Sequence, residues 1–141
     1  MGWNEKKRLN DSFPNLKTYQ GPQLLEKQLR KSRLIITFSN STVFLQTMSI
    51  NFPTILCFNP IRSPLLMSAL PYYNELRRVK VFHDSPESAA EWINTIYENP
   101  SSWWTSPETQ KARKQFCNEF IRASPSFHKE WAKEILKATK K

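Results

Sequence analysis

Apolar runs of strand length alternate with helical patterns along this chain of 141 residues. The three clearest runs are Arg33–Phe38, Pro53–Phe58 and Val79–Phe82. Each is followed by a segment that carries apolar residues at helical spacing. Strands that alternate with helices form parallel sheets through right-handed crossovers. The sequence therefore predicts the α/β class, with a small parallel sheet, flanking helices and a helical C-terminus.

Proline and hydroxyl residues indicate where several helices begin and end. Ser63-Pro64 and Ser85-Pro86 each predict the start of a helix, and Thr105–Glu108 has the form of a capping box. We expect Pro71 to interrupt the first of these helices, because proline lacks an N–H donor. Asn99-Pro100 is expected to end the second helix.

These patterns divide the chain into three segments. Residues 1–20 predict an irregular entry segment, in which Thr18 and Tyr19 suit a short edge strand. Residues 21–104 contain the three runs and predict a Rossmann-like domain, which opens with a helix at Gly21-Pro22. Residues 105–141 predict C-terminal helices that pack on this domain. The last helix is expected from about Phe127, with Trp131 and Ile135 facing inward.

Membrane insertion and secretion find no support in the sequence. No apolar run approaches the roughly 20 residues that a spanning helix needs. The N-terminal segment MGWNEKKRLN lacks the apolar stretch of a signal peptide. A cytoplasmic protein is therefore predicted. Cys57 and Cys117 lack CxxC spacing, so we expect reduced thiols, with a disulfide as the alternative.

Glycine is rare, and this limits how the chain can bind phosphate. Only Gly2 and Gly21 are present, which excludes the Walker A loop and the GxGxxG fingerprint. The formal net charge of +9 suits nucleic acid, an anionic membrane surface or a phosphorylated ligand, and equally a solvated surface. A phosphate site would have to use a helix N-terminus with hydroxyl side chains.

One polar segment fits that requirement. Ser39, Asn40, Ser41 and Thr42 follow the first run and precede a helical pattern, so they should lie at the carboxyl edge of the sheet, where open α/β proteins bind ligands. The alternative is an ordinary helix cap, for which the same residue types are preferred. Asn59 and Arg62 follow the second run and should lie at the same edge, although Arg62 could equally be a solvated side chain.

No catalytic or metal-binding pattern is apparent. The two histidines and two cysteines lie far apart in sequence, and no Ser-His-Asp arrangement or carboxylate pair stands out. We expect His83 to border a ligand pocket and Asp84 or Ser85 to cap the following helix. Trp103-Trp104 could stack on a base or sugar, but closing the edge of a core is the favoured interpretation.

The order of several segments is similar to that of a known family. These segments are GWN at the start, SRLIITFSNST, NFPTILCFNP, Ala69–Tyr72, HDSPESAAEWI and SSWWTSPETQKARKQFC. With them the chain resembles the C-terminal part of transferases from bacterial surface-carbohydrate gene clusters, a family that looks like GT-B glycosyltransferases. The resemblance implies one Rossmann-like half of a GT-B fold, which binds a nucleotide-sugar donor.

This resemblance also implies roles for individual residues. The turn Ser39–Thr42 would contact the diphosphate or ribose, with Asn59 and Arg62 near the same cleft. Gln46 stands where the related pattern has an acidic residue, and its amide would replace a carboxylate as the acceptor for ribose hydroxyls. The acceptor domain would precede Met1, so the chain alone would be an inactive, partial transferase. No cofactor is expected.

Two alternatives belong to other classes of protein. A small basic module could bind nucleic acid through the lysine stripe Lys129, Lys133 and Lys137, which is extended by Lys140 and Lys141. A non-catalytic interaction domain would instead present an exposed apolar surface and self-associate. Sequence alone does not decide between these alternatives.

Overall fold

The computed structural model describes residues 5–17, 25–121 and 126–138. The chain forms two compact units, residues 1–32 and residues 33–141. The first unit contains α1 (Glu5–Ser12) and α2 (Leu25–Leu29). The expected edge strand at Thr18 and Tyr19 and the helix start at Gly21-Pro22 lie outside the described residues.

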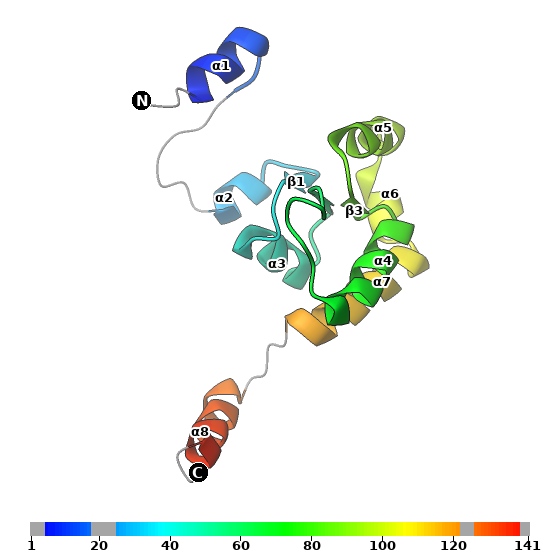
Figure 1. The fold of residues 1–141 in the computed structure, drawn as a ribbon. Coiled ribbons are helices and arrows are strands. Elements are labelled where there is room, and N and C mark those ends of the chain that lie inside the picture. The colour runs from blue at the N-terminus through cyan, green and yellow to red at the C-terminus, as the bar shows by residue number, and fades with distance from the viewer. Residues whose placement is uncertain (1–4, 18–24, 122–125, 139–141) are drawn as a thin grey trace. The chain divides into compact units, whose positions relative to one another are not determined.

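The second unit is built on a small parallel sheet (Figure 1). Its strands are β1 (Ile35–Thr37), β2 (Thr54–Cys57) and β3 (Phe82–His83), in the order β1-β2-β3. Both pairings are parallel, with Ile36 opposite Ile55 and Leu56 opposite Phe82. The predicted α/β class with a small parallel sheet is confirmed.

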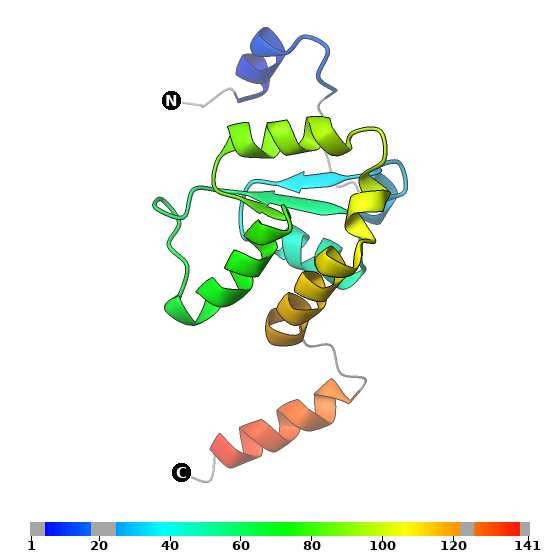
Figure 2. The ribbon, with the colours of Figure 1, turned by 90° about the vertical axis from the view of Figure 1, so that its right-hand side faces the viewer.

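Helices cover both faces of this sheet (Figure 2). One face is covered by α5 (Pro86–Ile96). The other face is covered by α3 (Thr42–Ser49), α4 (Leu70–Arg78) and α7 (Pro107–Phe120). The single-turn elements η1 (Met67–Ala69) and α6 (Pro100–Trp104) connect these helices, and α8 (Phe127–Ala138) gives the expected helical C-terminus. All four residues of β2 are buried, as a central strand requires.

Aromatic rings form the centre of the larger core, beneath the sheet. Phe116 packs edge-to-face against Phe44 and Tyr73, with ring centroids 5.5 and 5.4 Å apart. Tyr73 packs in the same way against Phe82 of β3. Edge-to-face pairs are the preferred geometry for aromatic rings. The core therefore joins α3, α4, α7 and β3 into one packed unit.

Two tryptophans donate hydrogen bonds to residues just after α3 and α4. The indole N–H of Trp104 donates to the backbone and side-chain oxygens of Asn51, just after α3. The indole N–H of Trp103 donates to the carbonyl of Val79, which ends α4. The bond to the C-cap residue Val79 satisfies a carbonyl that a helix C-terminus leaves without a partner. Trp104 is buried, so the interpretation of this pair as the edge of a core is confirmed.

The third strand lies farther along the chain than predicted. Val79 ends α4, and Lys80 has a φ of 62°, in the left-handed region. This conformation reverses the chain direction directly after the helix, as glycine commonly does. The strand therefore begins only at Phe82, next to the Val81 carbonyl that accepts from the Leu56 N–H, and the predicted strand over residues 79–82 is wrong at its start.

Two predicted helix boundaries are also wrong. Pro71 lies in the first turn of α4 instead of interrupting a helix from Ser63-Pro64. Ser106, rather than Thr105, caps α7 and accepts from the Thr109 N–H, so Glu108 lies one position too early for a capping box. The expected helix end at Asn99-Pro100 is confirmed, since α5 ends at Ile96. Pro100 then begins α6, where the Asn99 side chain accepts a hydrogen bond from the Ser102 N–H.

Candidate functional site

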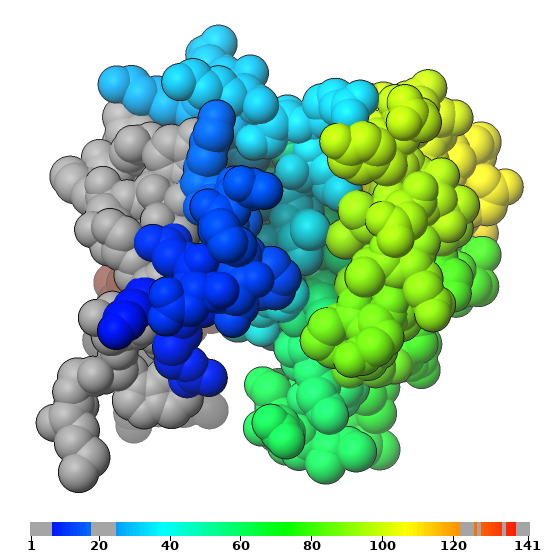
Figure 3. Space-filling view, turned by 90° about the horizontal axis from the view of Figure 1, so that it is seen from above, coloured from blue at the N-terminus to red at the C-terminus, as the bar shows by residue number. Residues whose placement is uncertain are grey.

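The carboxyl ends of the three strands meet at one edge of the sheet and surround an open hollow. Its volume is about 560 Å³. The loop after β2 and the start of α5 both line it, and the space-filling view shows these two segments side by side (Figure 3). The lining residues are Phe38, Cys57, Phe58, Asn59, Arg62, Ser63, Asp84, Ser85, Pro86 and Glu87.

The predicted segment Ser39–Thr42 forms the turn between β1 and α3. Ser39 and Asn40 are exposed, and Ser41 occupies the N-cap position of α3. The Ser41 side chain makes no capping hydrogen bond. Because a helix leaves its first N–H groups without internal partners, this N-terminus presents donors toward solvent.

Three of the other helices differ in this respect, whereas α4, which follows η1 directly, also begins without a side-chain cap. Hydrogen bonds from backbone N–H groups to the side chains of Ser85, Asn99 and Ser106 cap α5, α6 and α7. The hydroxyl-rich start of α3 therefore does not act as the ordinary side-chain cap that its composition allows. Its polar groups remain directed at the surface.

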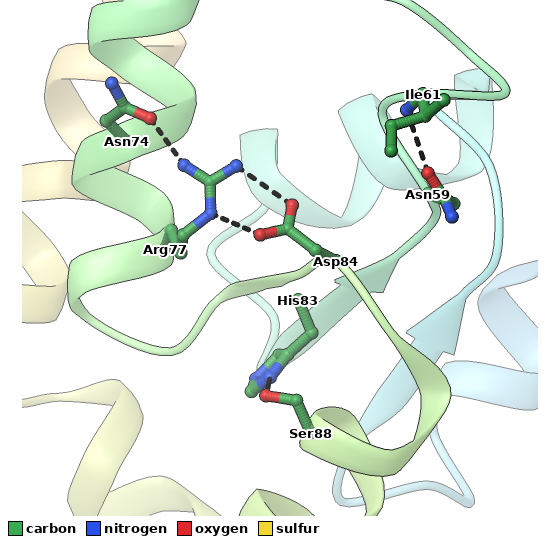
Figure 4. A network of polar contacts seen from close by, with 7 residues as sticks. All are labelled: Asn59, Ile61, Asn74, Arg77, His83, Asp84 and Ser88. Carbon is green, nitrogen blue, oxygen red and sulfur yellow. Dashed lines mark hydrogen bonds and ion pairs between the residues drawn. The ribbon is translucent and has the colours of Figure 1, made fainter.

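Asn59 and Arg62 lie in the loop that follows β2. The Asn59 side-chain oxygen accepts a hydrogen bond from the Ile61 N–H, at 2.8 Å (Figure 4). The backbone carbonyl of Asn59 accepts from the N–H groups of Arg62 and Ser63. Asn59 thus shapes the turn that brings Arg62 into the wall of the hollow. Arg62 itself is exposed.

The predicted residues do not all come together. Asn59 and Arg62 line the hollow, and Phe38, directly before Ser39, lines it from the β1 side. Gln46 is exposed on the second turn of α3 and does not line the hollow, nor do Ser39–Thr42.

An ion pair that sequence reasoning missed connects α4 to the loop after β3. The Arg77 guanidinium donates two hydrogen bonds to the Asp84 carboxylate, from Nε at 2.7 Å and from Nη2 at 2.9 Å (Figure 4). Arg77 also bonds Asn74 and lies over the Phe82 ring. Since both charged side chains are partly exposed, we assign the pair a role in positioning more than in stability. Arg77 neutralises one of the two carboxylates of the hollow and leaves Glu87 as the other.

His83 lies beneath the hollow, not at its border. It is 2% exposed and is not among the residues that line the hollow, so the prediction that it borders a ligand pocket is wrong. Its Nε2 bonds the Lys80 carbonyl, which can only accept, and therefore this nitrogen carries the proton. Nδ1 then accepts from the Ser88 hydroxyl, at 2.9 Å. Burial lowers the pKa of His83, more than the Lys80 carbonyl raises it.

We expect this histidine to make the stability of the fold depend on pH. The pKa of His83 is lowered in the folded state, whereas the unfolded chain has the ordinary value of 6.5. The unfolded state therefore binds more protons, and the free energy of unfolding should fall as the pH decreases below about 6.5. Urea denaturation at a series of pH values between 7.5 and 5, in steps of ~0.5 pH units, tests this expectation.

The matched control for this titration is His83→Gln. Glutamine offers an N–H and an oxygen to the same two partners but does not titrate. The pH dependence should be weaker in the variant. An identical pH dependence in both proteins would show that His83 does not cause it.

Burial also raises the pKa of the Cys57 thiol, which lines the hollow. The neighbouring carboxylates Glu87 and Asp84 raise it further. Both cysteines are free thiols, as predicted.

Among the described residues, no group of three or more His, Cys, Asp or Glu side chains could hold a metal ion. None of the helices in the described ranges is long and apolar enough to cross a bilayer.

Within the part of the chain that the structure describes, the hollow combines the Arg62 cation and the Glu87 carboxylate, for which no ion pair is seen, with a nearby helix N-terminus that lacks a side-chain cap. A family of transferases matches this chain across residues 1–135. The chain belongs to the LIC12162 family of transferases. No curated protein matches it, and no solved structure does.

Proposed function

We propose that the chain is the donor-binding part of a glycosyltransferase of the GT-B type, active in surface-carbohydrate synthesis. The nucleotide-sugar donor binds at the carboxyl edge of the sheet, between the start of α3 and the loop after β2. The sugar acceptor binds to a separate Rossmann-like domain, so this chain alone is inactive. The family membership supports transfer chemistry in general, and the choice of donor depends on the site.

The uncapped N-terminus of α3 is the observation that carries this proposal. Helix N-termini bind phosphate through their free N–H groups and the positive end of the helix dipole. Ser39, Ser41 and Thr42 add hydroxyl donors at the same terminus, where no side chain competes as a cap. A diphosphate is the ligand that such an arrangement suits when glycine loops are absent.

The two walls of the hollow suit other parts of the same ligand. Arg62 provides a charge-assisted contact for phosphate oxygens. Glu87 can accept hydrogen bonds from sugar hydroxyls, and no ion pair of Glu87 competes for it within the described residues. We propose that Asn59 orients Arg62 and that the exposed Gln46 amide contacts the ribose.

A panel of nucleotide sugars tests this proposal. We expect at least one of the UDP-, GDP-, ADP- or CMP-linked sugars to raise the melting temperature at millimolar concentration, because a ligand that binds only the folded state stabilises it. Arg62→Gln should weaken binding by about tenfold or more, since a hydrogen bond to a charged group contributes ~1.5–3 kcal/mol.

Lys111→Gln provides the matched control for Arg62→Gln. Lys111 is exposed on α7 and does not line the hollow, and its replacement removes the same charge. Binding should be unchanged in this variant. The absence of a thermal shift with every donor, or equal losses in the two variants, would contradict donor binding at this edge.

A further inference from the structure

The C-terminal helix α8 exposes large apolar side chains, whereas the preceding helix α7 buries apolar side chains of its own. Trp131, Ile135 and Leu136 are 69%, 57% and 61% exposed. On α7, by contrast, Ala112 and Phe116 are buried in the core. The expectation that Trp131 and Ile135 face inward is therefore wrong, because both side chains lie at the surface.

The lysines of α8 lie on a separate side of the helix from its tryptophan. At about 100° per residue, the residues Trp131, Ile135 and Leu136 span an arc of about 140°. Lys129, Lys133 and Lys137 share the adjoining arc because they are four residues apart. An exposed apolar face bordered by lysines is typical of helices that lie in the interface of a bilayer.

We propose that α8 binds the surface of a membrane that contains anionic lipids. Trp131 and Ile135 enter the boundary between headgroups and acyl chains, and the lysines contact the phosphates of the headgroups. The charge of the segment supports this choice, since residues 127–141 contain five lysines against two glutamates. The helix lies on the membrane and does not span it, because its 12 residues are too few. This function does not depend on the proposed donor site.

Cosedimentation of the full chain with lipid vesicles tests the proposal. We expect binding to vesicles made of equal parts phosphatidylcholine and phosphatidylserine, and much weaker binding to phosphatidylcholine alone. Lys129→Gln combined with Lys133→Gln should weaken binding by an order of magnitude or more, at about fivefold for each lysine. Trp131→Ala combined with Ile135→Ala should reduce binding at least tenfold. The four substituted side chains are all exposed, so the fold should survive these changes.

Two double variants serve as matched controls. Lys111→Gln with Lys114→Gln removes the same charge from α7, and Leu66→Ala with Met67→Ala removes exposed apolar side chains elsewhere. Both should bind vesicles as the wild type does. Equal binding by all variants, or equal binding to neutral and anionic vesicles, would overturn the proposal. So would self-association or RNA binding that the α8 variants abolish when no vesicle binding occurs.

Discussion

Replacing Phe116 with alanine is expected to lower the free energy of unfolding by about 3–5 kcal/mol. Phe116 is 1% exposed and joins α7 to both α3 and α4 through its contacts with Phe44 and Tyr73. Alanine would leave a cavity among rigid aromatic rings, which can only partly relax into it. Equilibrium denaturation in urea, followed by circular dichroism, measures the loss.

Phe120→Ala is the matched control on the same helix. Phe120 contacts the rings of Tyr72, Tyr73 and Phe116 but is 40% exposed, so its removal should cost markedly less. Phe116→Leu provides a milder change at the same position, because a loss of several kcal/mol is a large part of the ~5–15 kcal/mol that stabilises a typical domain. If Phe116→Ala costs no more than Phe120→Ala, then α7 is not part of the core that we describe.

Replacing Ser41 with aspartate is expected to change stability and donor binding in opposite directions. Ser41 has the extended backbone of an N-cap residue, but its side chain makes no capping bond. Aspartate would cap the helix and favourably oppose its dipole, for a gain of about 1 kcal/mol. The same carboxylate would repel a diphosphate, and because like charges at close range cost several kcal/mol, donor affinity should fall by more than tenfold.

Ser41→Asn separates these two effects. Asparagine caps helices about as well as aspartate but carries no charge. It should therefore stabilise the fold and weaken binding less than aspartate does. Melting temperature and donor titration, measured on the same samples, give both quantities. A Ser41→Asp variant that binds the donor as tightly as the wild type would exclude the start of α3 as the phosphate site.

The layout of the sheet was predictable because it depends on residues that are close in sequence. The runs around Ile36, Ile55 and Phe82 are predominantly apolar, as expected of strands that are covered by helices. The position of β3 was not predictable, because it depends on the left-handed backbone of Lys80. Lysine rarely adopts that conformation, so its identity gives no indication of the turn.

The site was predictable where it depends on strand ends and not where it depends on tertiary pairing. Asn59 and Arg62 follow β2 directly, and they line the hollow. Arg77 and Asp84 belong to different elements, and only the turn after α4 brings them together. For Trp131, periodicity indicated an apolar face on the helix, but periodicity does not show what covers such a face.

The two indole hydrogen bonds have a consequence for motion within the unit. Trp103 and Trp104 hold the C-terminal ends of α4 and α3 at the amino edge of the sheet, opposite the hollow. Amide protons at that edge should exchange with solvent only when the whole unit unfolds. In the loop over residues 59–66, exposed side chains predominate, so its amides should exchange through local opening. Adaptation to a ligand would then be confined to one edge of an otherwise rigid body.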